Sequence, residues 1–154
     1  MAEPLFPFFD RLVLRLAGEN WIANDLAPSS LADITNHWWL NHGQVWVSSL
    51  YSGNTIFGSP HVNHAFRAWH DRTHIKLGAE FDREGEARVC VAQQNDVMGL
   101  PSPVTYDELA LAFRILECEV MGQFNYQAAT GQFPADQRAF TVDYFNKRGW
   151  SMSP

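Results

Sequence analysis

Residues 59–78 have the sequence SPHVNHAFRAWHDRTHIKLG, and this stretch shows the signals of a helix with defined ends. Ser59 is a favourable N-cap residue, and Pro60 suits the first helical position because its backbone angle is already helical. Gly78 is typical of the residue that ends a helix. Between them an apolar stripe recurs at helical spacing, formed by Val62, Phe66, Trp69 and Leu77. We therefore predict a long amphipathic helix here.

Similar signals indicate further helices on both sides of this stretch. Two of them start with a capping box, in which Ser30 or Thr105 is followed three residues later by an acidic residue. Asp82 is expected to cap another helix, and Pro134 is expected to open the last one. The additional helices predicted in this way cover residues 30–41, 82–99, 105–129 and 134–149.

The first 58 residues are rich in aromatic side chains, and their secondary structure is less defined. Residues 44–51 (QVWVSSLY) favour a short strand, and residues 12–16, which fit a helix or a strand, are the candidate partner. We predict an all-α or nearly all-α bundle of five or six helices, with a short β-hairpin in the N-terminal half as the open alternative. Residues 1–154 are expected to form one domain, in which the N-terminal part packs on a helical core of residues 59–149.

The composition excludes several classes of protein. The chain has 154 residues, a net charge of −6 and no run of Lys or Arg, whereas nucleic-acid binding usually needs a concentrated basic face. No apolar run approaches the ~20 residues of a membrane helix, and the N-terminus lacks the basic region of a secretory signal. Cys90 and Cys118 are too few for a disulfide framework. We expect a soluble, cytoplasmic protein with reduced thiols and no nucleic-acid or membrane partner.

Four of the six histidines lie between His61 and His74. In a helix His70 and His74 would point about 40° apart, at the edge of the apolar stripe, because successive residues turn by about 100°. Two histidines four residues apart are a common way for a helix to offer two imidazoles to one metal ion. Asp71, three residues before His74, is the predicted second-shell partner that fixes the tautomer of His74.

A metal ion bound by two histidines needs a further ligand from another helix. Glu119 is predicted at the edge of the apolar face of the longest helix, and Gln123 in the middle of it; Glu86 is predicted on the inner side of the preceding helix. Buried carboxylate and amide groups are costly without a partner. We therefore take His70, His74, Glu119 and Glu86 as candidate ligands of zinc, iron or manganese, with Gln123 in the second shell.

Two other interpretations of the same residues stay open. The histidines and the inward-facing polar groups can bond to one another as an ordinary polar core, and histidines can act in acid–base catalysis without a metal. The sequence contains neither His-Glu-x-x-His nor the repeated Glu-x-x-His of di-iron bundles, and it lacks Walker A and Gly-x-Ser-x-Gly. No motif therefore fixes a reaction, which argues against an enzyme.

Consecutive tryptophans suggest an interaction surface. Trp38 and Trp39 would point about 100° apart on a helix, so at least one is directed towards the edge of the core or a partner. The run VNHAFRAWHD of residues 62–71, followed by His74, resembles sequences of uncharacterised phage and bacterial proteins over residues 57–86. This resemblance brings no assigned activity and no site residue, and it implies a phage-related accessory protein.

Taken together, these observations lead to two expectations about function. The preferred one is a small protein that acts through a protein-interaction surface, as an inhibitor, adaptor or structural accessory, with a protein partner or a second copy of itself. The alternative is a metal-binding protein or metal-dependent enzyme that uses His70 and His74 together with Glu119 or Glu86.

Overall fold

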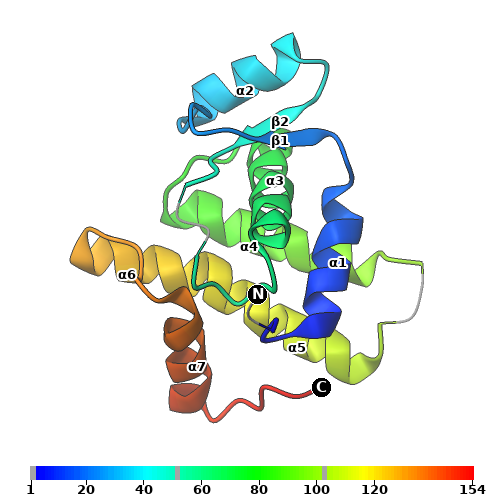
Figure 1. The fold of residues 1–154 in the computed structure, drawn as a ribbon, viewed down its shortest axis with the longest axis vertical. Helices are drawn as coiled ribbons and strands as arrows, with labels where there is room; N and C mark the ends of the chain where they lie inside the picture. The colour runs from blue at the N-terminus through cyan, green and yellow to red at the C-terminus, as the bar shows by residue number, and fades with distance from the viewer. Residues whose placement is uncertain (1–2, 51–52, 102–103) are drawn as a thin grey trace.

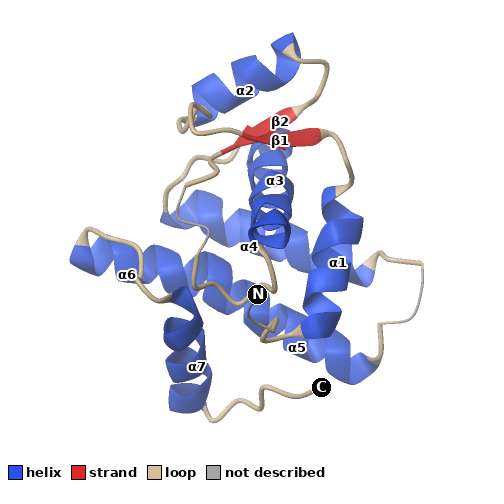
Figure 2. Ribbon diagram, viewed as in Figure 1, coloured by secondary structure: helices blue, strands red, loops and turns tan. Residues whose placement is uncertain are grey.

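The computed structural model describes residues 3–50, 53–101 and 104–154, and most of these residues are helical (Figures 1 and 2). The mainly α-helical fold is therefore confirmed, with a small β element in the N-terminal half. In chain order the elements are α1 (Pro7–Ala17), β1 (Trp21–Ala23), α2 (Leu31–Leu40), β2 (Val45–Val47), α3 (Pro60–Leu77), α4 (Arg83–Met98), α5 (Tyr106–Leu116), the π-helical turn η1 (Glu117–Gly122), α6 (Gln123–Thr130) and α7 (Gln137–Arg148).

Helix α3 is the central element of the fold. It contacts α1, α2, α4 and both strands, while α4 in turn contacts α5 and η1. Figure 1 shows α1 on one side of α3 and the β strands with α2 at one end of the molecule. The rod that contains α5 and α6 crosses the other half, with α7 beyond it. The histidine-bearing helix is thus enclosed by segments from both halves of the chain.

The expected helix starts are confirmed by their capping contacts. The side chains of Ser30, Ser59, Asp82 and Thr105 each accept a hydrogen bond from the backbone N–H three residues later. Gly78 ends α3 with a φ of 59°, in the left-handed region that glycine adopts without strain. Local side-chain chemistry therefore fixes where these helices begin and end.

The start expected for the last helix was wrong. Helix α7 begins at Gln137, and its N-cap is Asp136 rather than a residue next to Pro134. The Asp136 carboxylate accepts the N–H of Ala139 at 2.8 Å, which a proline side chain is unable to do. The capping side chain sets the helix start, and the proline belongs to the preceding loop.

The two strands differ from the expected hairpin. Residues 12–16 are helical within α1, and β2 instead pairs in parallel with β1, with Trp21 opposite Val45. Helix α2 connects the two strands, because a parallel pair needs a crossover connection. Strand β2 covers only the first part of the strand expected over residues 44–51, and Tyr51 lies outside the described residues.

The long helix after Thr105 contains a change of helical type that was not expected. Its middle turn, Glu117–Gly122, is π-helical. Gly122 lies against the ring of Tyr144 in α7, where an added Cβ would come within 2.8 Å of Tyr144 Cε2. The helix thus packs closely on α7 at this turn, and such single π turns often occur at functional sites.

The main hydrophobic core joins the aromatic N-terminal segment to the helices that follow. The Phe9 ring of α1 lies 6.3 Å from both Phe57 and Phe66, and Phe6 lies 5.6 Å from Phe145 of α7. These rings belong to one cluster that also contains Leu12, Val13, Trp69, Leu111, Ile115 and Leu116. Burial of this aromatic surface is the main stabilising contribution to the packing of α1 on α3.

Within the described residues, no helix is both long enough and apolar enough to span a membrane.

Candidate metal centre

Two histidines of α3 and one glutamate of α4 meet close to the turn between these helices. His70 and His74 lie one helical turn apart on the side of α3 that faces α4. Residues 78–82 connect the two helices, and Glu86 lies in the first turn of α4. The site therefore combines a pair predicted by helical spacing with one of the two candidate glutamates.

The three ligating atoms form a nearly equilateral triangle. His70 Nε2 lies 3.2 Å from Glu86 Oε2, His74 Nε2 lies 3.3 Å from the same oxygen, and the two Nε2 atoms lie 3.1 Å apart. No other described set of His, Cys, Asp or Glu side chains is grouped in this way. The His74 side chain is 0% exposed, Glu86 10% and His70 17%, so the triangle is largely shielded from water.

The remaining nitrogen of each imidazole is held by a carbonyl oxygen. His70 Nδ1 donates to Gln93 Oε1 at 3.0 Å, and His74 Nδ1 donates to the backbone oxygen of Ala79 at 2.8 Å. A carbonyl oxygen only accepts, so each Nδ1 carries the hydrogen and each neutral ring directs the lone pair of Nε2 into the triangle. Partners of this kind orient histidine ligands in metal sites.

The electrostatics show that the triangle attracts positive charge. Burial opposes ionisation of Glu86, but its hydrogen bonds with His70 and His74 outweigh that effect and hold the Glu86 pKa at about 2. Burial likewise opposes charging of His70, yet the contact with Glu86 raises the His70 pKa above its ordinary value. Two lone pairs and a carboxylate oxygen face one another, and either a proton or a metal ion must satisfy them.

A glycine lets the turn before α4 pack onto the first turn of that helix. A Cβ on Gly85 would come within 1.8 Å of the backbone oxygen of Glu80. The same turn contains Ala79, which bonds to His74, and Phe81, whose ring centroid lies 4.2 Å from that of His74. Gly85 therefore permits the close approach that places Glu86 beside the histidines.

Glu119, the other candidate ligand, is not part of the triangle. It lies in η1, where its carboxylate accepts hydrogen bonds from Thr141 Oγ1 at 3.1 Å and from Gln123 Nε2 at 2.9 Å. Gln123 thus bonds to Glu119 rather than to a histidine, so it lies outside the group formed by His70, His74 and Glu86. The two residues form a separate polar cluster with α7, because the π turn directs Glu119 towards Thr141. Burial raises the Glu119 pKa to about 7.

Asp71 does not bond to His74 in the way the sequence suggested. The Nδ1 atom of His74 donates to the oxygen of Ala79, so that carbonyl and not Asp71 determines the tautomer. Asp71 interacts electrostatically with His70, His74 and Glu86, and burial raises its pKa. It is an acidic neighbour of the triangle and not one of its members.

Sequence reasoning missed Gln93, although a signal for it existed. Gln93 follows Glu86 by seven residues, which is two helical turns, so both side chains lie on the same face of α4. It is fully buried, and its Nε2 atom has no hydrogen-bond partner among the described residues. The Ala79 carbonyl had no signal, since every residue has a backbone carbonyl.

The two cysteines are free and buried. Burial raises the Cys90 pKa to about 11, and burial also raises the pKa of Cys118, whose Sγ bonds to Thr141. Both groups are therefore thiols at neutral pH, and neither joins the triangle.

The two tryptophans proposed for interaction differ in exposure. Trp39 is 71% exposed, and the next residue, Leu40, is 79% exposed. Trp38 is half-buried and packs against Val45 and Val47, with its ring 5.0 Å from that of Trp39. Of the pair, Trp39 is therefore the side chain available to a partner.

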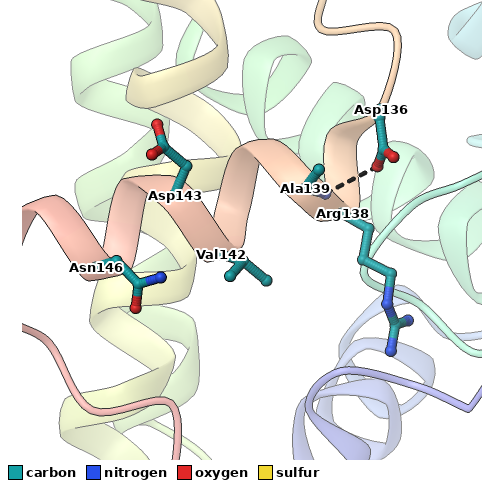
Figure 3. Close-up of a pocket in the computed structure, with 6 residues that line it drawn as sticks. All are labelled: Asp136, Arg138, Ala139, Val142, Asp143 and Asn146. Carbon is teal, nitrogen blue, oxygen red and sulfur yellow. Dashed lines mark hydrogen bonds between the residues drawn. The ribbon is translucent and has the colours of Figure 1, made fainter.

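A shallow hollow of 420 Å³ lies elsewhere on the molecule, along α7 (Figure 3). Its lining residues are Asp136, Arg138, Ala139, Val142, Asp143 and Asn146. Figure 3 shows that Asp136 is engaged in capping Ala139, while Arg138 points away from Asp143. The lining thus lacks a converging set of reactive groups, and it includes no member of the triangle.

A comparison of the chain with protein-family models, curated proteins and solved structures finds no match. The roles of the residues are therefore inferred from their geometry.

Proposed function

We propose that this protein binds one divalent transition-metal ion through His70 Nε2, His74 Nε2 and Glu86 Oε2. The observation that carries the proposal is the triangle of separations, 3.1, 3.2 and 3.3 Å. Hydrogen bonds between a charged nitrogen and a carboxylate are usually shorter, about 2.7–2.9 Å. A single proton also lies between only two of the three atoms at a time, whereas a metal ion binds all three.

The size of the triangle fits a metal ion. A point equidistant from the three atoms lies about 1.85 Å from each of them in their plane. An ion at the 2.0–2.1 Å typical of zinc with imidazole or carboxylate would therefore lie roughly 0.9 Å out of the plane. The angles between its bonds would be about 100°, between the octahedral and the tetrahedral value.

The donor types favour zinc and iron over calcium or magnesium. Two imidazole nitrogens suit zinc, iron, nickel and copper, while calcium and magnesium prefer oxygen ligands throughout. The partners of the two Nδ1 atoms, Gln93 and the carbonyl of Ala79, hold the rings in the orientation that ligation needs. Zinc is the probe of choice because it forms stable sites with three nitrogen or oxygen ligands and has no redox chemistry.

The test is zinc stoichiometry after stripping with a chelator, reloading and gel filtration, measured by elemental analysis. Wild type is expected to retain one zinc ion per chain. Glu86→Gln and His70→Asn should lose it, because each removes a ligand; His70 is partly exposed, so its replacement is tolerable for folding. Glu119→Gln is the matched control, since Glu119 lies in the other polar cluster.

The outcomes separate the alternatives. Circular dichroism establishes that each variant is folded before its zinc content is compared. A folded wild type that retains no zinc would show that the triangle is an ordinary polar cluster, in which a proton on His70 faces Glu86. If Glu119→Gln loses zinc and Glu86→Gln retains it, the ligand is Glu119 and the assignment of Glu86 is wrong.

A second candidate function is supported by the exposed end of α2. Trp39 and Leu40 place two large apolar side chains in water next to each other, at 71% and 79% exposure. Adjacent apolar side chains of this size are typical of interaction surfaces. We propose that they contact a second copy of the chain.

Sedimentation velocity over a range of concentrations tests this second proposal. Wild type should associate, and the double variant Trp39→Ser with Leu40→Ser should be monomeric. Tyr106→Ser is the control, because Tyr106 is 85% exposed at the beginning of α5. A wild type that stays monomeric at every concentration would refute self-association through α2.

A further inference from the structure

We infer that a metal ion bound by His70, His74 and Glu86 keeps an open coordination position for a small monoanion. This inference rests on the proposed function, because it concerns the same ion. It adds the class of ligand that the site takes from solution. Three points support it: the distribution of the ligands around the ion, the access of solvent, and the charge of the ligand set.

The three protein ligands occupy only one side of the ion. With bond angles of about 100° they form three neighbouring corners of a tetrahedron or an octahedron. At least one corner on the opposite side is then free of these residues. Among the described His, Cys, Asp and Glu side chains, none is grouped with the triangle as a fourth ligand.

The nearest acidic and thiol groups do not complete the coordination. Asp71 interacts electrostatically with the triangle but does not belong to the group of converging atoms. Cys90 stands four residues after Glu86 on α4, yet its sulfur is not grouped with the three converging atoms. Closed structural zinc sites use four protein ligands, whereas sites with three keep a position for water or substrate.

Two of the three side chains keep a small exposure to solvent. His74 is 0% exposed, whereas the side chains of Glu86 and His70 are 10% and 17% exposed. The exchangeable ligand therefore enters beside His70 and Glu86. This limited opening favours a small ligand.

The charge of the ligand set favours an anion. Two neutral imidazoles and one carboxylate leave a divalent ion with a net charge of about +1. Burial raises the pKa of the neighbouring Asp71 and so opposes a second negative charge beside the triangle. A bound ion would offer this position to water, and a small monoanion would compete with the water for it.

Cobalt-substituted protein provides a direct test, because the visible spectrum of Co²⁺ responds to the number and type of its ligands. Sodium azide is titrated into the Co²⁺ protein, and the spectrum is recorded at each step. We expect a saturable change with one azide per cobalt ion, reversed by dialysis. The Glu119→Gln variant should behave like wild type.

The result separates failure of this inference from failure of metal binding. A cobalt spectrum that disappears in folded Glu86→Gln establishes binding at the triangle. If that spectrum is unchanged by azide, and also by the smaller cyanide ion, the position is closed and the inference is wrong while metal binding stands. A folded wild type without a cobalt spectrum would refute both.

Discussion

Glu119→Gln should remove a large pH dependence of stability. Glu119 is 9% exposed, and one carboxylate oxygen faces the hydroxyl of Thr141 at 3.1 Å. That hydroxyl has one hydrogen and a second acceptor, the backbone oxygen of Gln137, at 3.0 Å. When Glu119 is protonated, its O–H donates to Thr141, which then donates to Gln137. Glu119 thus keeps hydrogen-bond partners when it is neutral, and protonation removes the cost of burying a charge.

The magnitude follows from the pKa of Glu119. Burial raises this pKa from 4.5 to about 7, although the hydrogen bonds with Thr141 and Gln123 act in the opposite direction. Between these two pH values the folded state binds more protons than the unfolded state, so the free energy of unfolding falls as pH rises. A shift of about 2.5 pH units corresponds to roughly 3 kcal/mol, which is lost between pH 4.5 and pH 7 and stays lost above it.

Urea denaturation of wild type and Glu119→Gln at pH 5 and pH 8 measures the effect, with a chelator present throughout. A glutamine can accept from Gln123 and donate to Thr141, so it mimics the protonated acid. The variant should gain about 2.5 kcal/mol relative to wild type between pH 5 and pH 8, because part of the loss in wild type already occurs below pH 5. Groups that titrate in both proteins, including His70, cancel in this difference. The reasoning is refuted if the stability difference is the same at both pH values; Glu80→Gln, at an exposed position, is the control.

Three further predictions concern the metal centre. Gly85→Ala should lower the free energy of unfolding by at least about 2 kcal/mol, because the new Cβ meets a backbone oxygen. Gly99→Ala is the control and should lower it less; equal urea midpoints for the two variants would contradict this. Gln93→Met removes the acceptor for His70 Nδ1 and should weaken zinc binding about 10–100-fold. Competition with a chromogenic chelator measures the affinity, and an unchanged value would show that Gln93 does not orient the ring. In the metal-free protein the lowered pKa of Glu86 contributes stability that is present above pH 4.5 and is lost as the pH falls towards 2. Thermal melts in acid should therefore show a larger loss of stability in wild type than in Glu86→Gln. The same dependence of melting temperature on pH in both proteins would exclude this contribution.

Local chemistry made much of the fold predictable. Helix starts at Ser30, Ser59, Asp82 and Thr105 depend on side chains that bond to the backbone three residues later, and this distance is fixed within one turn. Strand β1 was missed because three residues, Trp21–Ala23, are too short to show an alternating pattern. Its pairing with β2 is decided by tertiary packing around α3.

The candidate site shows the same division between local and tertiary information. His70 and His74 share a helix, so their proximity follows from spacing alone. The choice between Glu86 and Glu119 depends on how α4 and η1 rotate against their neighbours, and both residues lie on buried faces. The spacing of residues within a helix predicts neither this rotation nor the π turn that directs Glu119 towards α7.

The short connection between α3 and α4 has a consequence for the order of folding. All three proposed ligands lie within residues 70–86, and the carbonyl that orients His74 lies between them. Contacts between residues close in the chain form with little loss of loop entropy and favour rapid folding. The segment of α3 and α4 can therefore assemble the triangle before α1 and α7 dock, and a metal ion would act on an early folding step.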